Sequence, residues 1–236
     1  MKSAGFVIPV YNPATGWQGR LAEELRAACR GLSVQVVVVD DASLRPVAVE
    51  TLRAGLPGAR VELVRFERNR GKGAAVRAGL ERLALADYYF YTDSDFPYRP
   101  QDAAAMMRAI DAGADVAPGM RDGTYFAGIP PMRRLISKAL SALVKTAIRI
   151  PFTDTQCGLK CFNEKGRELL LKTRVERFLF DVEFIYLAYH TPDVKVSPVS
   201  ATLRPGITVS NVGGALLLRE FGNFLQILYR IYFRGW

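Results

Sequence analysis

The stretch Tyr88-Tyr-Phe-Tyr-Thr-Asp-Ser-Asp-Phe-Pro97 begins with four aromatic residues and ends in a turn that carries Asp93 and Asp95. Because the aromatic run has no polar face, it predicts a central strand buried on both sides, as in parallel sheets covered by helices. In open α/β sheets, ligands bind just outside the carboxyl ends of such strands. Two carboxylates there can share a hard divalent cation, Mg²⁺ or Mn²⁺. An Asp-x-Asp triplet is also common in solvated turns. Evidence from the rest of the chain is therefore needed to distinguish a metal site from an ordinary turn.

Strand and helix patterns alternate on both sides of this stretch. They predict one α/β domain with a mostly parallel, doubly wound sheet flanked by helices. Strands are expected at 4–10, 34–39, 61–66, 88–91 and 116–118, and helices at 17–29, 46–54 and 101–112, with one more through Leu80.

The charge balance points to an anionic partner. The chain has 32 Lys and Arg against 23 Asp and Glu, a formal net charge of +9. Nucleic acid, nucleotide, phosphate and an anionic membrane surface all fit this excess. The aromatic residues lie in strands and the C-terminal segment rather than between basic residues, which argues against single-stranded nucleic acid. Three cysteines are too few for a disulfide framework and favour a reducing compartment.

Polar residues follow each predicted strand and should converge at one edge of the sheet. Asp40 and Asp41 could accept hydrogen bonds from a base and a ribose, or they could cap the turn that follows them. The Gly-Lys-Gly sequence at 71–73 would let the backbone approach an anion at a helix N-terminus. Arg121 follows another strand and could meet a phosphate or stand exposed.

Eight segments in order resemble motifs of the family 2 glycosyltransferases of the GT-A fold, within the dolichyl-phosphate mannose or glucose synthase-like branch. They are Val7-Ile-Pro-Val-Tyr-Asn12, Val38-Val-Asp-Asp-Ala-Ser43, Asn69 with Gly71-Lys-Gly73, Thr92-Asp-Ser-Asp95, Gly119-Met-Arg121, Arg133-Arg-Leu-Ile-Ser137, Asp154-Thr-Gln-Cys-Gly-Leu-Lys160 and Phe180-Asp-Val-Glu183.

The resemblance implies a nucleoside-diphosphate sugar donor, UDP- or GDP-hexose, transfer with inversion, and Mg²⁺ or Mn²⁺ bound by Asp93 and Asp95. A metal and fixed cations would stabilise the negative charge that builds on the leaving diphosphate. The residues implied in donor nucleotide binding are Pro9, Tyr11, Asn12, Asp40, Asp41, Lys72, Asp93 and Arg121.

The acceptor side is expected on the segment 131–150, whose apolar residues recur at helical spacing. Arg133 and Ser137 would lie one turn apart on this helix and could grip one phosphate. In the resembled branch this is the lipid-phosphate site, and Arg204 with Ser210 is similar to the loop that closes over the phosphates. An ordinary amphipathic helix with solvated basic residues is the alternative.

The candidate catalytic residues are Asp95, Asp181 and Glu183. A phosphate acceptor is largely dianionic at neutral pH and needs little help from a general base. A sugar hydroxyl would need one, and Asp154, Asp181 or Glu183 could serve. Asp181 and Glu183 are two positions apart, so on a helix only one of them could face the site. A surface or capping role is the alternative for these acids.

The expected organisation is a GT-A domain at 1–210 and an amphipathic, aromatic-rich helical tail at 211–236. The tail could lie in a membrane interface, or pack on the domain or on a second subunit. The predicted function is a membrane-peripheral, metal-dependent inverting transfer of a hexose to a polyprenyl phosphate on the cytoplasmic face. Transfer to a sugar hydroxyl in a glycan and a non-catalytic basic binding module are the alternatives.

Overall fold

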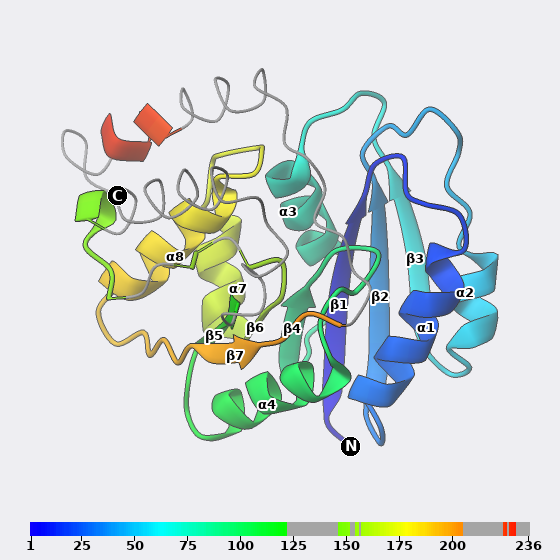
Figure 1. The fold of residues 1–236 in the computed structure, drawn as a ribbon, viewed down its shortest axis with the longest axis horizontal. Coiled ribbons are helices and arrows are strands. Elements are labelled where there is room, and N and C mark those ends of the chain that lie inside the picture. The colour runs from blue at the N-terminus through cyan, green and yellow to red at the C-terminus, as the bar shows by residue number, and fades with distance from the viewer. Residues whose placement is uncertain (122–145, 152–153, 156, 205–223, 226, 230–236) are drawn as a thin grey trace.

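The computed structural model describes residues 1–121, 146–151, 154–155, 157–204, 224–225 and 227–229. The first part of the chain alternates strands and helices, and a shorter second part completes the sheet (Figure 1). The elements are β1 (Ser3–Val10), α1 (Trp17–Ala28), β2 (Ser33–Asp40), α2 (Glu50–Gly55), β3 (Arg60–Arg65), α3 (Lys72–Arg82), β4 (Tyr88–Tyr91), α4 (Pro100–Asp111), β5 (Val116–Arg121), β6 (Lys160–Phe162), α7 (Glu164–Leu171), α8 (Phe180–His190) and β7 (Val199–Ala201).

Within the described residues the strands form a seven-stranded sheet in the order β3-β2-β1-β4-β6-β5-β7. The pairs β1 with β2, β1 with β4, β2 with β3, and β5 with β7 are parallel. The exception is β6, which lies between β4 and β5 and is antiparallel to both. The predicted α/β class and mostly parallel sheet are confirmed, whereas β6 and β7 were not predicted.

Alternate residues of the central strands enter two separate hydrophobic layers. On one face, Phe6 of β1 and Phe90 of β4 stack with ring centroids 4.6 Å apart and pack with α1, α2 and α4. On the other face, Val7 and Tyr91 pack with α3, α7 and α8. The four residues of β4 are buried, as the aromatic run predicted. Helices therefore cover both faces and leave the strand ends to carry polar chemistry (Figure 1).

One helix begins later than predicted. The pattern predicted a helical start at Pro46, but α2 begins at Glu50. Val49 is only 1% exposed and adopts a non-helical φ of −129° as the N-cap. The chain is therefore not helical before Val49, whose side chain is buried in the core. The first hydrogen bond of the helix runs from the Arg53 N–H to the Val49 carbonyl at 2.9 Å.

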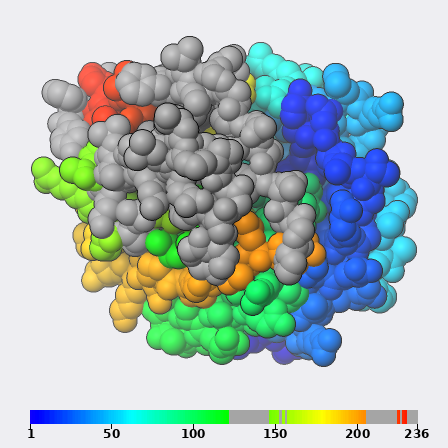
Figure 2. All heavy atoms as spheres, in the orientation of Figure 1, coloured from blue at the N-terminus to red at the C-terminus, as the bar shows by residue number. Residues whose placement is uncertain are grey.

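The second part of the chain packs against the first. The β7 segment (orange) lies beside α4 (green) on the visible face of the molecule (Figure 2). In the predicted tail, Phe224 and Ile227 are buried in the layer that contains α8, while Leu225 and Tyr229 are about half exposed. Among the residues described, no helix combines the length and apolar character that a membrane crossing requires.

Candidate active site

The turn after β4 presents two carboxylates at the carboxyl edge of the sheet. Phe96 is fully buried and has a left-handed φ of 38°, a conformation that is uncommon for a bulky residue. Its N–H donates to the Asp93 carbonyl at 3.0 Å. The core therefore anchors the turn through Phe96, while Asp93 stays partly exposed and Asp95 exposed.

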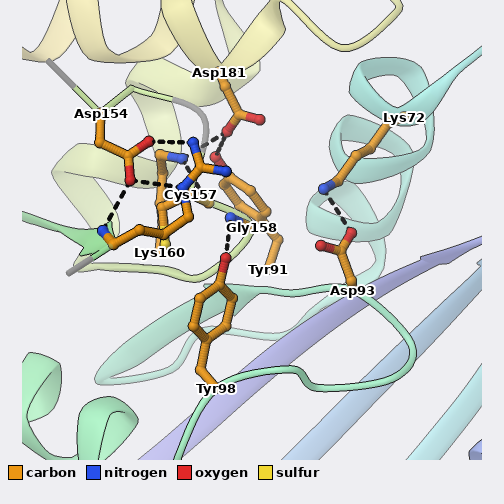
Figure 3. A network of polar contacts seen from close by, with 10 residues as sticks. Lys72, Tyr91, Asp93, Tyr98, Asp154, Cys157, Gly158, Lys160 and Asp181 are labelled. Atoms are coloured by element: carbon orange, nitrogen blue, oxygen red, sulfur yellow. Dashed lines mark hydrogen bonds and ion pairs between the residues drawn. The ribbon is translucent and has the colours of Figure 1, made fainter. Parts of the chain in front are cut away.

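Lys72, the first residue of α3, reaches this turn. Its Nζ lies 2.7 Å from Asp93 Oδ1, and its side chain is only 14% exposed (Figure 3). Burial disfavours the charged ammonium, but the carboxylates of Asp93 and Asp181 outweigh it, so the pKa of Lys72 is raised. Lys72 is therefore a fixed cation beside the acidic turn.

The acidic turn has the chemistry of a divalent metal site. Loss of hydration raises the pKa of Asp95 and the nearby Asp93 carboxylate raises it further, although Asp95 keeps contact with solvent. A divalent cation between the two would relieve this repulsion, and hard oxygen ligands suit Mg²⁺ or Mn²⁺. Among the described residues no group of three or more His, Cys, Asp and Glu could hold a metal. The two carboxylates thus fit an ion whose other ligands come from water or a diphosphate.

Gly158 gives the Asp93 carboxylate its space. A β-carbon added to Gly158 would lie 2.2 Å from Asp93 Oδ2. The Gly158 N–H donates to the Tyr98 hydroxyl at 3.0 Å (Figure 3), and this ties the Cys157–Gly158 backbone to the end of the acidic turn. Burial, and then the neighbouring Cys157, raise the pKa of Tyr98 well above its ordinary value.

The loops after β1 and β2 are joined to each other. The Asn12 N–H donates to Ser43 Oγ at 2.9 Å, and Asn12 Oδ1 accepts from the Leu44 N–H at 2.9 Å. Asp40 is fully buried. Its two carboxylate oxygens accept from the Ser43 N–H at 2.8 Å and from Arg65 at 3.0 Å. The sequence left open whether Asp40 caps the turn after β2 or contacts a ligand. Its contact with the Ser43 N–H is that of a turn cap.

Tyr11 stands beside these loops with 54% of its surface exposed, and Pro9 lies one residue before the end of β1. A cavity of about 550 Å³ opens between residues 12–18 and 44–48. Its lining does not include Lys72 or Asp93, so it lies apart from the acidic turn.

Arg121 at the end of β5 forms a two-pronged ion pair with Asp154. Its Nε lies 2.8 Å from Asp154 Oδ2 and its other guanidinium nitrogen lies 2.6 Å from Oδ1. Its backbone N–H also donates to Asp154 at 2.8 Å. The side chains are 18% and 12% exposed. This pair joins the end of β5 to Asp154, which precedes β6 in the sequence.

A buried charge pair that the sequence did not predict lies beneath the site. Lys160 of β6 is fully buried, and its Nζ donates to Asp181 Oδ1 at 2.7 Å and to the Cys157 carbonyl at 2.6 Å (Figure 3). The Tyr91 hydroxyl also donates to Asp181 Oδ1. Burial raises the pKa of Tyr91 well above its ordinary value, and the Asp181 charge adds to this. Lys160 and Asp181 both lie in motifs named above, but the sequence did not indicate that they pair.

Glu183 points to a different partner. It is fully buried, and its carboxylate accepts from the Arg174 N–H at 2.9 Å and the Val175 N–H at 2.7 Å. A general base must reach a substrate proton, and a carboxylate held by backbone amides in the core does not. These contacts are those of a structural residue, and the catalytic roles expected of Glu183 and Asp181 stay predictions.

Arg204 binds the backbone of the acidic turn. Its guanidinium donates to the Asp95 carbonyl at 2.7 Å and the Phe96 carbonyl at 2.9 Å, and pairs with Glu24 of α1 at 2.5 Å. These contacts of Arg204 are with the protein, whereas the sequence analysis expected it to meet a phosphate. The other predicted acceptor residues, Arg133, Ser137 and Ser210, lie outside the described residues.

With this geometry in view, comparison with known proteins identifies the family. The model of glycosyl transferase family 2 matches residues 6–169. The chain belongs to glycosyl transferase family 2. This confirms the resemblance drawn from the eight motifs.

Curated relatives of this family 2 chain carry names of polyprenyl-phosphate sugar transferases. An undecaprenyl-phosphate 4-deoxy-4-formamido-L-arabinose transferase of Pseudomonas paraeruginosa is 29% identical over 81% of this chain and 56% of its own length. The same-named protein of Edwardsiella ictaluri is 32% identical over 70% and 50%. A dolichyl-phosphate beta-glucosyltransferase of Dictyostelium discoideum is 28% identical over 77% and 61%. The chain thus spans about half to three fifths of the length of these relatives.

Solved structures with a similar fold include glucosyl-3-phosphoglycerate synthase from Mycobacterium tuberculosis. Its complex with Mn²⁺, UDP and phosphoglyceric acid has a TM-score of 0.70 at 17% identity, over 96% of this chain and 78% of that chain. Its complex with Mg²⁺ and UDP has a TM-score of 0.67 at 16% identity, over 96% and 79%. The family 2 chain therefore has the GT-A fold.

Proposed function

We propose that this family 2 domain transfers a hexose from a UDP- or GDP-sugar to a polyprenyl phosphate. The observation that carries the donor half is the acidic turn at the sheet edge with the Lys72 ammonium 2.7 Å from Asp93. The acceptor half is supported by relatives named for undecaprenyl phosphate and dolichyl phosphate. A domain that works on such lipids would lie peripherally on a membrane, and the proposal places it on the cytoplasmic face.

Asp93 and Asp95 would hold Mg²⁺ or Mn²⁺, which supplies positive charge to the leaving diphosphate. A fold neighbour has been solved with Mn²⁺ and with Mg²⁺. Lys72 adds a fixed ammonium at the same place, where preorganised charge stabilises the transition state without reorganisation. The C–O bond to the diphosphate then breaks while an acceptor oxygen attacks the opposite face, which inverts the anomeric carbon.

The remaining donor contacts are assigned to the loops after β1 and β2. Tyr11 has an exposed ring that can stack on a base, while Pro9, Asn12 and Asp40 shape the loops around it. Arg121 would face the phosphates with its position fixed by Asp154.

The acceptor phosphate would be bound by Arg133, Ser137, Arg204 and Ser210. A phosphate monoester attacks as a dianion and needs no strong base. The contacts of Asp181 agree with this, because its Oδ1 already accepts from Lys160 and Tyr91. Asp181 would then pair with the Lys160 ammonium rather than remove a proton from the acceptor.

The test is transfer of labelled hexose from UDP-glucose and from GDP-mannose, with Mg²⁺ or Mn²⁺, to a short polyprenyl phosphate. The proposal expects label in an organic-extractable product and none with Asp95→Asn. Asp193→Asn is the matched control, because Asp193 is exposed and its φ of 61° suits Asn.

Two other outcomes would change the proposal. Metal-dependent binding of the nucleotide without lipid product would retain the donor site and favour a sugar hydroxyl as acceptor. Salt-dependent binding of oligonucleotides with no affinity for either nucleotide sugar would replace it with a basic binding module.

A further inference from the structure

Every polar group of Asp41 is already engaged within the protein. One carboxylate oxygen accepts from the Arg70 N–H at 2.6 Å, and the other accepts from the Gly71 N–H at 2.8 Å. The Asp41 carbonyl accepts from the Asn69 side-chain amide at 3.3 Å, and its N–H donates to the Val10 carbonyl at 2.9 Å. Asp41 is only 4% exposed. This burial and the two backbone amides leave little of the carboxylate accessible to a base or a ribose.

The loop that Asp41 holds is also fixed from the opposite side. Gly71 has a φ of +106°, and a β-carbon on it would lie 2.6 Å from the Glu176 carbonyl. The same carbonyl accepts from the Ala74 N–H in the first turn of α3 at 3.0 Å. The start of α3 is thus held between the Asp41 carboxylate and the Glu176 carbonyl, in a backbone conformation that favours glycine.

This loop sets the position of the Lys72 backbone. Lys72 directly follows Gly71 and is the first residue of α3, and its ammonium reaches Asp93 Oδ1 at 2.7 Å. A shift of the backbone at 70–71 would move the lysine stem and its charge. Asp41 is therefore connected to the acidic turn through one loop and one side chain.

We propose that Asp41 is a positioning residue that acts on the donor diphosphate through Lys72 and does not contact the base or ribose. This revises the donor contact expected from the sequence. It rests on the proposed function, in which Lys72 meets the donor diphosphate. Binding of any metal-bound diphosphate, with or without a nucleoside, should then depend on Asp41.

The test compares UDP with inorganic pyrophosphate, each with Mn²⁺, by calorimetric titration of the whole chain. Asp41→Asn replaces one acceptor oxygen with an amide that faces a backbone N–H. We expect it to weaken both ligands by the same factor, about tenfold, as befits one lost charge-assisted bond. In a Lys72→Met background the same change should have no further effect, because Lys72 carries the coupling.

Asn69→Ala is a milder second variant, since Asn69 is exposed and bonds only the Asp41 carbonyl and, at 3.5 Å, Arg177 among the contacts described. It should weaken both ligands equally but less. Thermal unfolding of each variant confirms that the protein is folded, and Asp193→Asn serves as the control.

A loss of UDP affinity with pyrophosphate unchanged would overturn the inference and place Asp41 on the nucleoside. Additive losses in the double variant would overturn it as well, because Asp41 would then not act through Lys72. Failure of the unmodified protein to bind UDP or GDP with Mn²⁺ would instead contradict the proposed function.

Discussion

The carboxylate of Asp93 rests directly against the backbone of Gly158. A β-carbon on Gly158 would lie 2.2 Å from Asp93 Oδ2, far inside van der Waals contact, and the next nearest atom outside Asp93 is the Tyr98 hydroxyl at 3.7 Å. The clash would fall on the side chain that the proposed function assigns to the metal. Glycine at position 158 therefore leaves the space that the Asp93 carboxylate occupies in the proposed donor site.

Gly158→Ala should push the Asp93 carboxylate away from Lys72 while the fold persists. We expect the affinity for UDP or GDP with Mn²⁺ to fall by about tenfold or more, since a charged hydrogen bond and a proposed metal ligand are both displaced. Calorimetric titration measures this. Gly19→Ala in α1 is the control, because no atom lies within 4 Å of its added β-carbon. Unchanged affinity in Gly158→Ala would show that Asp93 can move without loss.

Arg204→Ala should weaken metal-dependent donor binding, because it removes the donors that hold the Asp95 and Phe96 carbonyls. The expected loss is about tenfold, with a smaller one for Glu24→Gln, which still offers an oxygen to Arg204. Arg26→Ala, an exposed change on α1, should have no effect. A rise in the KM for the acceptor alone, with donor affinity intact, would mean that Arg204 works only on the acceptor phosphate.

Lys160→Met should strongly destabilise the protein, because it leaves the buried Asp181 carboxylate without its cation. The free energy of unfolding, from urea titration, should fall by about 3–5 kcal/mol. Adding Asp181→Asn should recover part of the loss, since no unpaired charge then remains. The exposed Lys172→Met should change stability by no more than about 0.5 kcal/mol. Equal effects of the two lysine changes would show that the buried pair adds no stability.

Cys29 should make the protein less stable in alkali. Burial raises its pKa to about 12, whereas an unfolded thiol ionises near pH 8.5. Above that pH the unfolded chain loses the proton and the folded chain keeps it, so the free energy of unfolding falls as pH rises. Relative to Cys29→Ala, the loss should be about 1 kcal/mol per pH unit between pH 9 and 10, measured by urea titration under reducing conditions. Parallel pH profiles would refute this.

The sequence predicted those features that depend on local pattern. The β4 strand was found because four aromatic residues in a row have no polar face, and the acidic turn because it ends that strand. β6 could not be found, since three residues carry little periodicity and its partners in β4 and β5 are distant in the chain. The partner of Lys160, Asp181, is 21 positions away. Asp40 and Asp41 were recognised, but only tertiary contacts reveal what their oxygens bind.

The place of β6 in the sheet has a consequence for how the protein is made. β6 separates β4 from β5 yet is synthesised after both. When the first 121 residues have left the ribosome, β4 still lacks one neighbour and β5 lacks both, and exposed strand edges recruit other chains. Translation must continue past Phe162 before β6 can join β4 to β5, and past Ala201 before β7 completes the sheet. A nascent chain stalled before that point would be a substrate for chaperones, and the rate of translation across residues 122–162 would influence the yield of soluble protein.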